Sequence, residues 1–153
     1  MKKLLTLLGL CGSLNASAEQ KSPITEEFLD SIAMIESHFD FKAVGDKGKA
    51  RGAYQMHKSA WDEAVLWSML DNGNHDIKIE WSEYATEPNI SRIVCKLYFK
   101  LLEYRFKNKM NRLPTALELY VCYNRGFTGA YRINFNADNG NYGRARYYLR
   151  NIR

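Results

Sequence analysis

The sequence has no apolar run long enough to span a membrane: the longest, Leu4 to Leu14, is well short of the roughly 20 residues that such a helix needs. It also has no cluster of Lys and Arg on one helix and no reader motif, so nucleic acid is not an expected partner. Its three histidines show no ligand spacing relative to a cysteine or to each other. No metal or other cofactor is therefore expected.

The first eighteen residues have the features of a secretory signal peptide. Lys2 and Lys3 precede the apolar stretch, and Ala16-Ser17-Ala18 supplies a small-residue cleavage site. We expect residues 1–18 to be removed and residues 19–153 to form one domain, periplasmic or secreted and without a stable membrane anchor. Losing two lysines lowers the formal net charge of +5 by two, so the mature domain is mildly basic. That charge suits an anionic polymer, but also many other partners.

The three cysteines fall into two groups. Cys11 lies in the expected signal peptide, where the bulky Leu10 before it argues against lipid attachment. Only Cys95 and Cys122 remain after cleavage. An even pair of cysteines in an oxidising compartment favours a disulfide. The alternative is two separate buried thiols that act as small apolar side chains.

Apolar residues recur at three- and four-residue steps in several segments, and this period predicts α-helices. Thr25, Ser59 and Pro88 are suited to helix starts, and Pro114-Thr115 with Glu118 reads as a capping box. Nothing repeats, and no alternating pattern demands a sheet. The prediction is an all-α fold, with room for a small hairpin in the glycine-containing loop 40–56, a second loop at 128–140, and most tryptophans in the core. The expected helices cover residues 25–38, 59–70, 88–106, 115–123 and 142–152.

Glu36 is anomalous on the first expected helix, because it lies four residues after Ile32 and seven after Leu29 and so shares the apolar face. A carboxyl among apolar neighbours has its charged form disfavoured and its pKa raised, as a general acid near neutral pH requires. The alternatives are a side chain that turns outward at the helix end, or a structural ion pair with an arginine. The glycine-containing loop that follows favours a functional site, because sites are commonly built on such loops.

Two stretches resemble the soluble lytic transglycosylase domain of the lysozyme-like superfamily. The first is Ile35-Glu36-Ser37 with the glycine-marked loop that follows and ends in Tyr54-Gln55-Met56. The second is Tyr123-Asn124-Arg125-Gly126, which is similar to the family's aromatic-asparagine-any-glycine motif. Both stand in the family's order. The resemblance implies a mostly helical lysozyme-like fold and an enzyme that cleaves the MurNAc-GlcNAc bond in the glycan strands of peptidoglycan.

The resemblance also implies roles for individual residues. Glu36 would protonate the leaving glycosidic oxygen and then act as base on the muramyl 6-hydroxyl, which closes a 1,6-anhydro ring without a second carboxylate. Gln55 would donate to and accept from a sugar N-acetyl group, unless it only stabilises its loop. Tyr123 and Asn124 would position the sugar, unless they serve as a core tyrosine and a capping amide. The further substrate-binding candidates, which would line or support the groove, are Ser37, Tyr54 and Met56.

The loop from Gly45 to Ala50 is longer and more charged than the loop usual in the family, and this departure leaves the outcome of the reaction open. Asp46 or Asp40 could act as a second carboxylate that holds a water molecule for hydrolysis. The nearest alternative is therefore a hydrolytic muramidase of the same fold. A further one is a non-catalytic protein that binds the cell wall or serves secretion. The sequence leaves any protein partner unknown.

Overall fold

The structure is a computed structural model that describes residues 21–73 and 78–152. The predicted signal peptide, residues 1–18, lies outside the described residues. Within those two ranges, no helix combines the length and the apolar character that crossing a membrane requires. The elements, in chain order, are α1 (Glu26–Ser37), β1 (Val44–Gly45), the 3-10 turn η1 (Asp46–Gly48), β2 (Ala50–Arg51), β3 (Met56–His57), α2 (Lys58–Asn72), α3 (Trp81–Tyr84), α4 (Pro88–Met110), α5 (Ala116–Arg125), α6 (Phe127–Arg132), the 3-10 turn η2 (Ala137–Asn139) and α7 (Gly143–Leu149).

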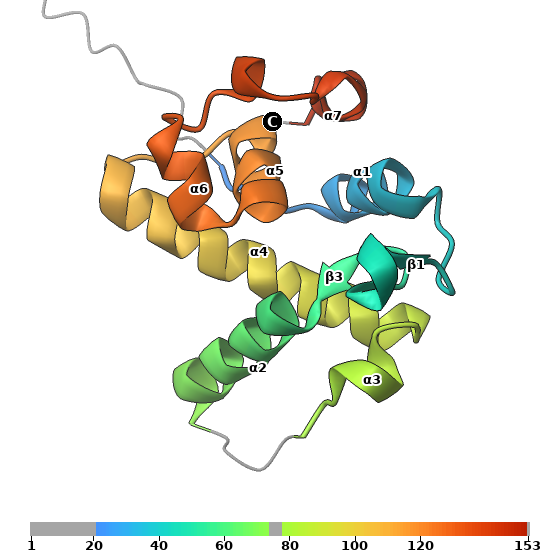
Figure 1. Cartoon of the computed structure of the whole chain (residues 1–153). Coiled ribbons are helices and arrows are strands. Elements are labelled where there is room, and N and C mark those ends of the chain that lie inside the picture. The colour runs from blue at the N-terminus through green and yellow to red at the C-terminus, as the bar shows by residue number, and fades with distance from the viewer. Residues whose placement is uncertain (1–20, 74–77, 153) are drawn as a thin grey trace, which may run out of the picture.

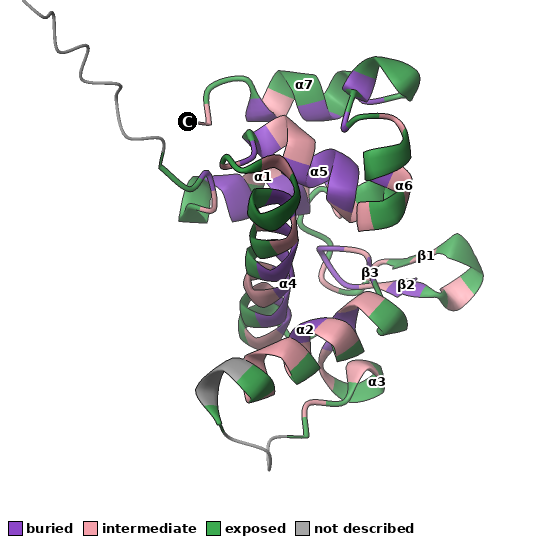
Figure 2. Ribbon diagram, turned by 90° about the vertical axis from the view of Figure 1, so that its left-hand side faces the viewer, coloured by how far each residue is buried: buried purple, intermediate pink, exposed green. Residues whose placement is uncertain are grey.

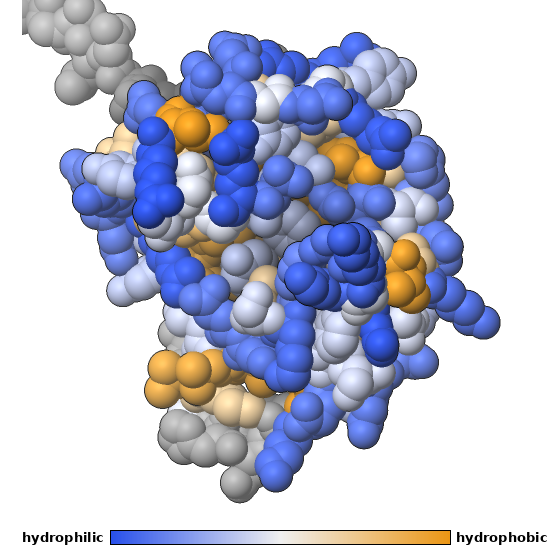
Figure 3. Space-filling model, in the orientation of Figure 1, coloured by the Kyte–Doolittle hydropathy of each residue, from blue (hydrophilic) through white to orange (hydrophobic). Residues whose placement is uncertain are grey.

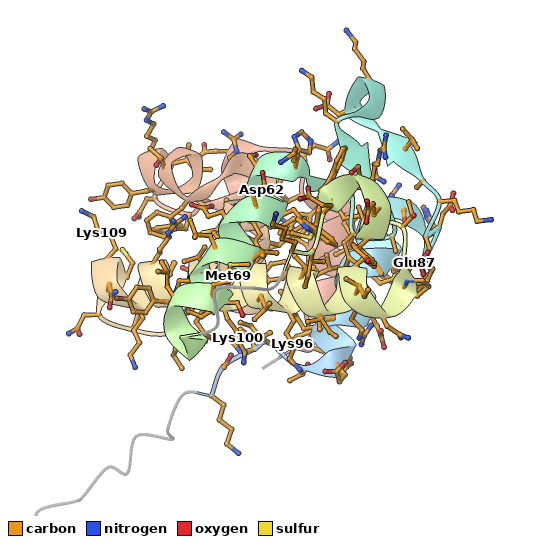
Figure 4. All side chains as sticks on the ribbon, turned by 90° about the horizontal axis from the view of Figure 1, so that it is seen from below. Asp62, Met69, Glu87, Lys96, Lys100 and Lys109 are labelled. Carbon is orange, nitrogen blue, oxygen red and sulfur yellow. The ribbon has the colours of Figure 1, made fainter. Side chains whose placement is uncertain are left out.

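The long helix α4 is the axis of the fold (Figure 1). In this view, helices α1, α5, α6 and α7 lie above α4, helices α2 and α3 lie below it, and the small sheet lies between α1 and α3. Seen from below, α2 crosses α4 and packs against it (Figure 4). The buried faces of α1, α4 and α5 meet in the core (Figure 2), whose fully buried members include Phe28, Leu29, Val94, Phe99, Leu102 and Leu119. The mostly helical fold predicted from the sequence is confirmed.

Two helices begin at the capping residues that the sequence offers, whereas Ser59 lies inside α2, whose N-cap is His57. The Thr25 side chain accepts a hydrogen bond from the Phe28 amide, and Thr115 and Glu118 form the expected capping box at the start of α5. The third expected helix is longer than predicted, because α4 continues past Phe106 until Asn111 adopts a left-handed conformation with φ 54°. The polar stretch Lys107-Asn108-Lys109 therefore belongs to the helix.

Two segments differ from the expected loops. The predicted hairpin is present and extends to a three-stranded antiparallel sheet, in the order β1-β2-β3. The predicted loop at 128–140 instead contains most of α6 and the turn η2. Phe135 is buried with its ring centroid 4.6 Å from that of Phe106, so packing orders a segment whose asparagines and glycines suggested a loop.

The disulfide hypothesis is wrong, because Cys95 and Cys122 are free thiols. Both are fully buried, Cys95 on α4 and Cys122 on α5, and the Cys95 thiol instead shares a hydrogen bond with Tyr123. Burial raises the pKa of both thiols, that of Cys122 to about 12, so they stay protonated. The alternative holds: the two residues fill the core as small apolar side chains.

Candidate active site

Glu36 lies in the last turn of α1, which ends where His38 adopts a left-handed conformation. Its side chain is half-buried, so it does not turn outward into solvent. The Tyr120 hydroxyl, from α5, donates a hydrogen bond of 2.7 Å to Glu36 Oε1. Arg144, at the start of α7, donates from Nη1 to the Ile35 carbonyl oxygen at 3.0 Å, which places a guanidinium near the carboxyl.

Burial raises the pKa of Glu36, because desolvation disfavours its charged form. The Tyr120 hydrogen bond and the Arg144 charge act in the opposite direction, and the effect of burial is larger. Burial and the neighbouring Glu36 also raise the pKa of Tyr120, which keeps the phenol a hydrogen-bond donor. Glu36 therefore holds its proton to a higher pH than an exposed glutamate, as a general acid must.

Gln55 braces the loop between β2 and β3. Its Nε2 donates to the carbonyl oxygens of Ala43, at 3.3 Å, and Gly52, at 2.9 Å. A Cβ atom at Gly45 would lie 2.1 Å from Gln55 Oε1, so glycine is needed there to make room for the amide. Gln55 thus stabilises its loop, and these hydrogen bonds hold the side-chain amide in one orientation.

The end of α1 is tied to the same loop. The Ser37 hydroxyl donates to the Ala53 carbonyl oxygen at 2.9 Å. At Gly52, where φ is 74°, an added Cβ would lie 1.9 Å from the Ala85 carbonyl oxygen, so the chain can pass only as glycine. These contacts hold the loop against the helix that carries the acid.

Tyr123 and Asn124 come from the last turn of α5 and face the loop. The Tyr123 hydroxyl donates to the Tyr54 carbonyl oxygen at 2.5 Å. Asn124 is exposed, and its Oδ1 accepts a hydrogen bond of 3.3 Å from the Tyr142 hydroxyl. The side chain of Tyr54 is only 1% exposed, and its hydroxyl accepts a hydrogen bond from Arg92. Tyr54 therefore supports the loop from the interior of the protein.

A cavity of about 270 Å³ brings most of the predicted site residues together; it is lined by Glu36, Asp46, Ala50, Gln55, His57, Tyr123 and Asn124. A second cavity, of about 200 Å³, shares four of these residues and adds Met56, among others. The surface is hollowed between the side of α5 and α6 and the small sheet (Figure 3). Ser37, Tyr54 and Asp40 do not line either cavity.

Asp46 lines the first cavity from the tip of the sheet. Its Oδ2 lies 3.3 Å from His57 Nε2, and both side chains are about half exposed. Asp40 instead accepts a hydrogen bond from the Lys42 amide and serves the turn after α1. Among the described residues, no group of three or more His, Cys, Asp or Glu side chains is placed to hold a metal ion.

The sequence did not single out Tyr120, Arg144 or His57 as site residues. A signal for Tyr120 was present, because it precedes Tyr123 by three residues and Asn124 by four and so shares their helix face. Arg144 gave no local signal, since only the packing of α7 against α1 brings it near the acid.

Comparison with known proteins identifies the family of the chain. Residues 13–142 match the family model described as Transglycosylase SLT domain. No curated protein matches the chain. The matched segment contains Glu36, Gln55 and Asn124, and the family is lysozyme-like and acts on peptidoglycan, outside the cytoplasm. The chain therefore belongs to the transglycosylase SLT domain family and is an enzyme that cleaves glycosidic bonds of peptidoglycan.

Proposed function

We propose that this chain is a peptidoglycan lytic transglycosylase that uses Glu36 as its single acid/base and leaves 1,6-anhydro-muramyl ends. One observation carries the proposal: a half-buried carboxyl with a raised pKa lines the same cavity as Gln55 and Asn124. A glycosidase acid needs this environment, since it must hold a proton at the pH at which the bond is cleaved.

The reaction consists of two successive proton transfers, one from Glu36 and one to it. Protonated Glu36 gives its proton to the glycosidic oxygen, the bond from C1 to that oxygen breaks, and the leaving sugar departs as an alcohol. The Glu36 carboxylate then takes the proton of the muramyl 6-hydroxyl, whose oxygen bonds to C1. The acid is restored and no water is consumed. The Tyr120 hydroxyl holds the carboxyl in place through both transfers.

Substrate positioning falls to the side chains opposite Glu36. Asn124 is exposed on the cavity, so its amide can donate to the carbonyl of an N-acetyl group. Gln55 shapes the floor of the cavity, because its Nε2 is engaged by the loop while the residue lines both cavities. Ser37 and Tyr54 support these side chains, and Tyr123 and Met56 form part of the wall.

A hydrolytic muramidase is the second candidate, and Asp46 is the observation that favours it. This carboxylate lines the Glu36 cavity, where an inverting enzyme would hold a water molecule. Against this role, the Asp46 carboxylate is about half exposed and faces His57. We therefore prefer the mechanism with one carboxyl.

Mass spectrometry of the products from purified peptidoglycan tests the proposal. Anhydro-muramyl ends and reducing ends differ by one water, so the two outcomes are separated by mass. The proposed mechanism gives anhydro ends with the wild-type protein and no products with Glu36→Gln. Reducing muramyl ends alone would establish hydrolysis and reject the transglycosylase outcome.

We further propose that residues 1–18 are a cleaved signal peptide and that residues 19–153 act as one exported domain. The support is the lysine pair, the apolar stretch and the Ala16-Ser17-Ala18 site, together with a substrate that lies outside the cytoplasm. Sequencing the amino terminus of protein recovered from the exported fraction should begin at Glu19. A terminus that still contains Lys2 and Lys3 would contradict it.

A further inference from the structure

The end of helix α1 is an unfavourable place for a negative charge, yet Glu36 lies there. The last four carbonyl groups of a helix have no partner within it, and they form the negative end of its dipole. Glu36 belongs to this last turn, and the turn, Met34 to Ser37, contains no basic residue. A cation that offsets the charge of an ionised Glu36 can therefore come only from another part of the fold.

Arg144, at the start of α7, supplies such a cation. The His38 amide closes the end of α1 by donating to the Met34 carbonyl oxygen at 3.2 Å. The next carbonyl oxygen, that of Ile35, accepts a hydrogen bond of 3.0 Å from Arg144 Nη1. Helices α1 and α7 pack against each other (Figure 1), although the two bonded residues are 109 positions apart in the sequence. The guanidinium thus caps the carbonyl group directly before Glu36.

The other titratable groups around Glu36 come from the neighbouring elements; they are Tyr120 and Tyr123 on α5, Cys95 on α4, and Asp46 and His57 at the small sheet. Burial raises the pKa of both phenols and of the thiol, so these three groups stay neutral. Any charge on His57 is paired with Asp46, whose carboxylate lies 3.3 Å away. Arg144 instead offers a permanent positive charge, because a guanidinium is not deprotonated in proteins. Its charge lowers the Glu36 pKa, against the larger effect of burial.

Arg144 does not line either of the two cavities that surround Glu36. It reaches the acid from the backbone of α1, so it acts on the substrate only through Glu36. In the proposed reaction Glu36 is neutral before the first proton transfer and is a carboxylate until the second. A positive charge that is already in place stabilises this carboxylate without any rearrangement during the reaction.

We propose that Arg144 is a positioning residue of this enzyme, which caps the end of α1 and stabilises the negative charge that Glu36 carries between its two proton transfers. The inference rests on the proposed function, because the charge has a role only if Glu36 releases and regains a proton. Burial makes Glu36 an acid that keeps its proton at higher pH, and Arg144 makes the release of that proton easier. The balance between the two sets the pH range in which the enzyme works.

Arg144→Gln tests this role, because a glutamine amide can still donate to a carbonyl oxygen but carries no charge. On soluble glycan fragments we expect kcat to fall by about tenfold, the order of effect of a cation at a partly buried helix end, with KM little changed. The alkaline limb of the pH–rate profile should move to higher pH, since the Glu36 pKa rises when the charge is removed. Arg144→Lys keeps the charge and should keep most of the rate. The matched control is Arg146→Gln, which removes a charge from the same helix and should change neither kcat nor the limb, because Arg146 pairs with Asp138.

A carbon-13 titration of the Glu36 carboxyl gives a second measurement, which the loss of a helix cap alone would not change. The carboxyl should titrate at higher pH in Arg144→Gln than in the wild type, and Arg146→Gln should match the wild type. Arg144→Met, which keeps the aliphatic part of the side chain, serves as the neutral variant if Arg144→Gln loses its fold.

Three results would each overturn the role of Arg144. They are an unmoved titration and limb in the neutral variant, a fall in kcat for Arg144→Lys equal to that for Arg144→Gln, and an effect confined to KM. In each case anhydro products from the wild type would leave the proposed function standing. Wild-type digestion by Glu36→Gln would reject both the proposed function and the role of Arg144.

Discussion

Glu36→Gln should remove activity and stabilise the fold in the same step. The substitution keeps the size of the side chain and the oxygen that accepts the Tyr120 hydrogen bond, but it removes the transferable proton. Loss of a general acid lowers the rate by about 10²–10⁴-fold. The gain in stability arises because burial raises the Glu36 pKa, so the folded protein bears an energetic cost for ionising this carboxyl.

The sign and the pH window of this gain follow from the raised pKa. As pH rises, the unfolded chain loses the Glu36 proton first, near its ordinary pKa of 4.5, and the folded protein loses it later. Between the two pKa values the folded state binds more protons, so wild-type stability falls with rising pH. Each unit of pKa difference is worth about 1.36 kcal/mol. For a domain of this size, 1 kcal/mol corresponds to about 4 °C in Tm.

Thermal unfolding of both proteins across a pH series measures the effect. The difference in Tm, Glu36→Gln minus wild type, should be positive at neutral pH and should vanish below about pH 4, where the wild-type carboxyl is protonated in both states. Wall digestion is followed in parallel. A variant that is less stable at neutral pH, or a difference independent of pH, would refute the argument that burial raises the pKa. Wild-type digestion by the variant would refute the catalytic assignment.

Three further substitutions test the neighbours of the acid. Tyr120→Phe removes a hydrogen bond to a charged group, worth about 1.5–3 kcal/mol, so the Glu36 pKa should rise further and the alkaline limb of the pH–rate profile should move to higher pH; an unmoved limb would contradict this. Asp46→Asn should lower activity by less than about tenfold and leave the product type unchanged, whereas a loss near that of a general base, about 10²–10⁴-fold, would make Asp46 catalytic. Gly52→Ala should lower Tm much more than Gly48→Ala. Both glycines have positive φ, but only at Gly52 would the new Cβ meet a carbonyl oxygen, at 1.9 Å. Equal losses of Tm would show that backbone strain alone matters.

The sequence predicted the helices well where local chemistry decides them. Two helix starts were predicted correctly, at Thr25 and at the pair Thr115 and Glu118. Capping is a contact between residues three positions apart, so the local sequence shows it. The apolar period placed Glu36 on the inner face of α1 for the same reason. The sequence failed at residues 128–140, whose asparagines and glycines resemble a loop although most of α6 lies there, because the burial of Phe135 against Phe106 is a contact between distant parts of the chain.

The sequence by itself determined the helical class, the family resemblance and the place of the Glu36 carboxyl on the apolar face of its helix, because these depend on spacing within single segments and on short motifs. Only the tertiary structure decided what surrounds that carboxyl. Tyr120 and Arg144 reach Glu36 from α5 and α7. Tertiary packing also left the two cysteines as separate thiols and put Trp81 at a cavity wall. Each of these outcomes depends on how helices far apart in the sequence pack together. The distances between those helices are fixed by the packing of the shared core and not by any local sequence pattern.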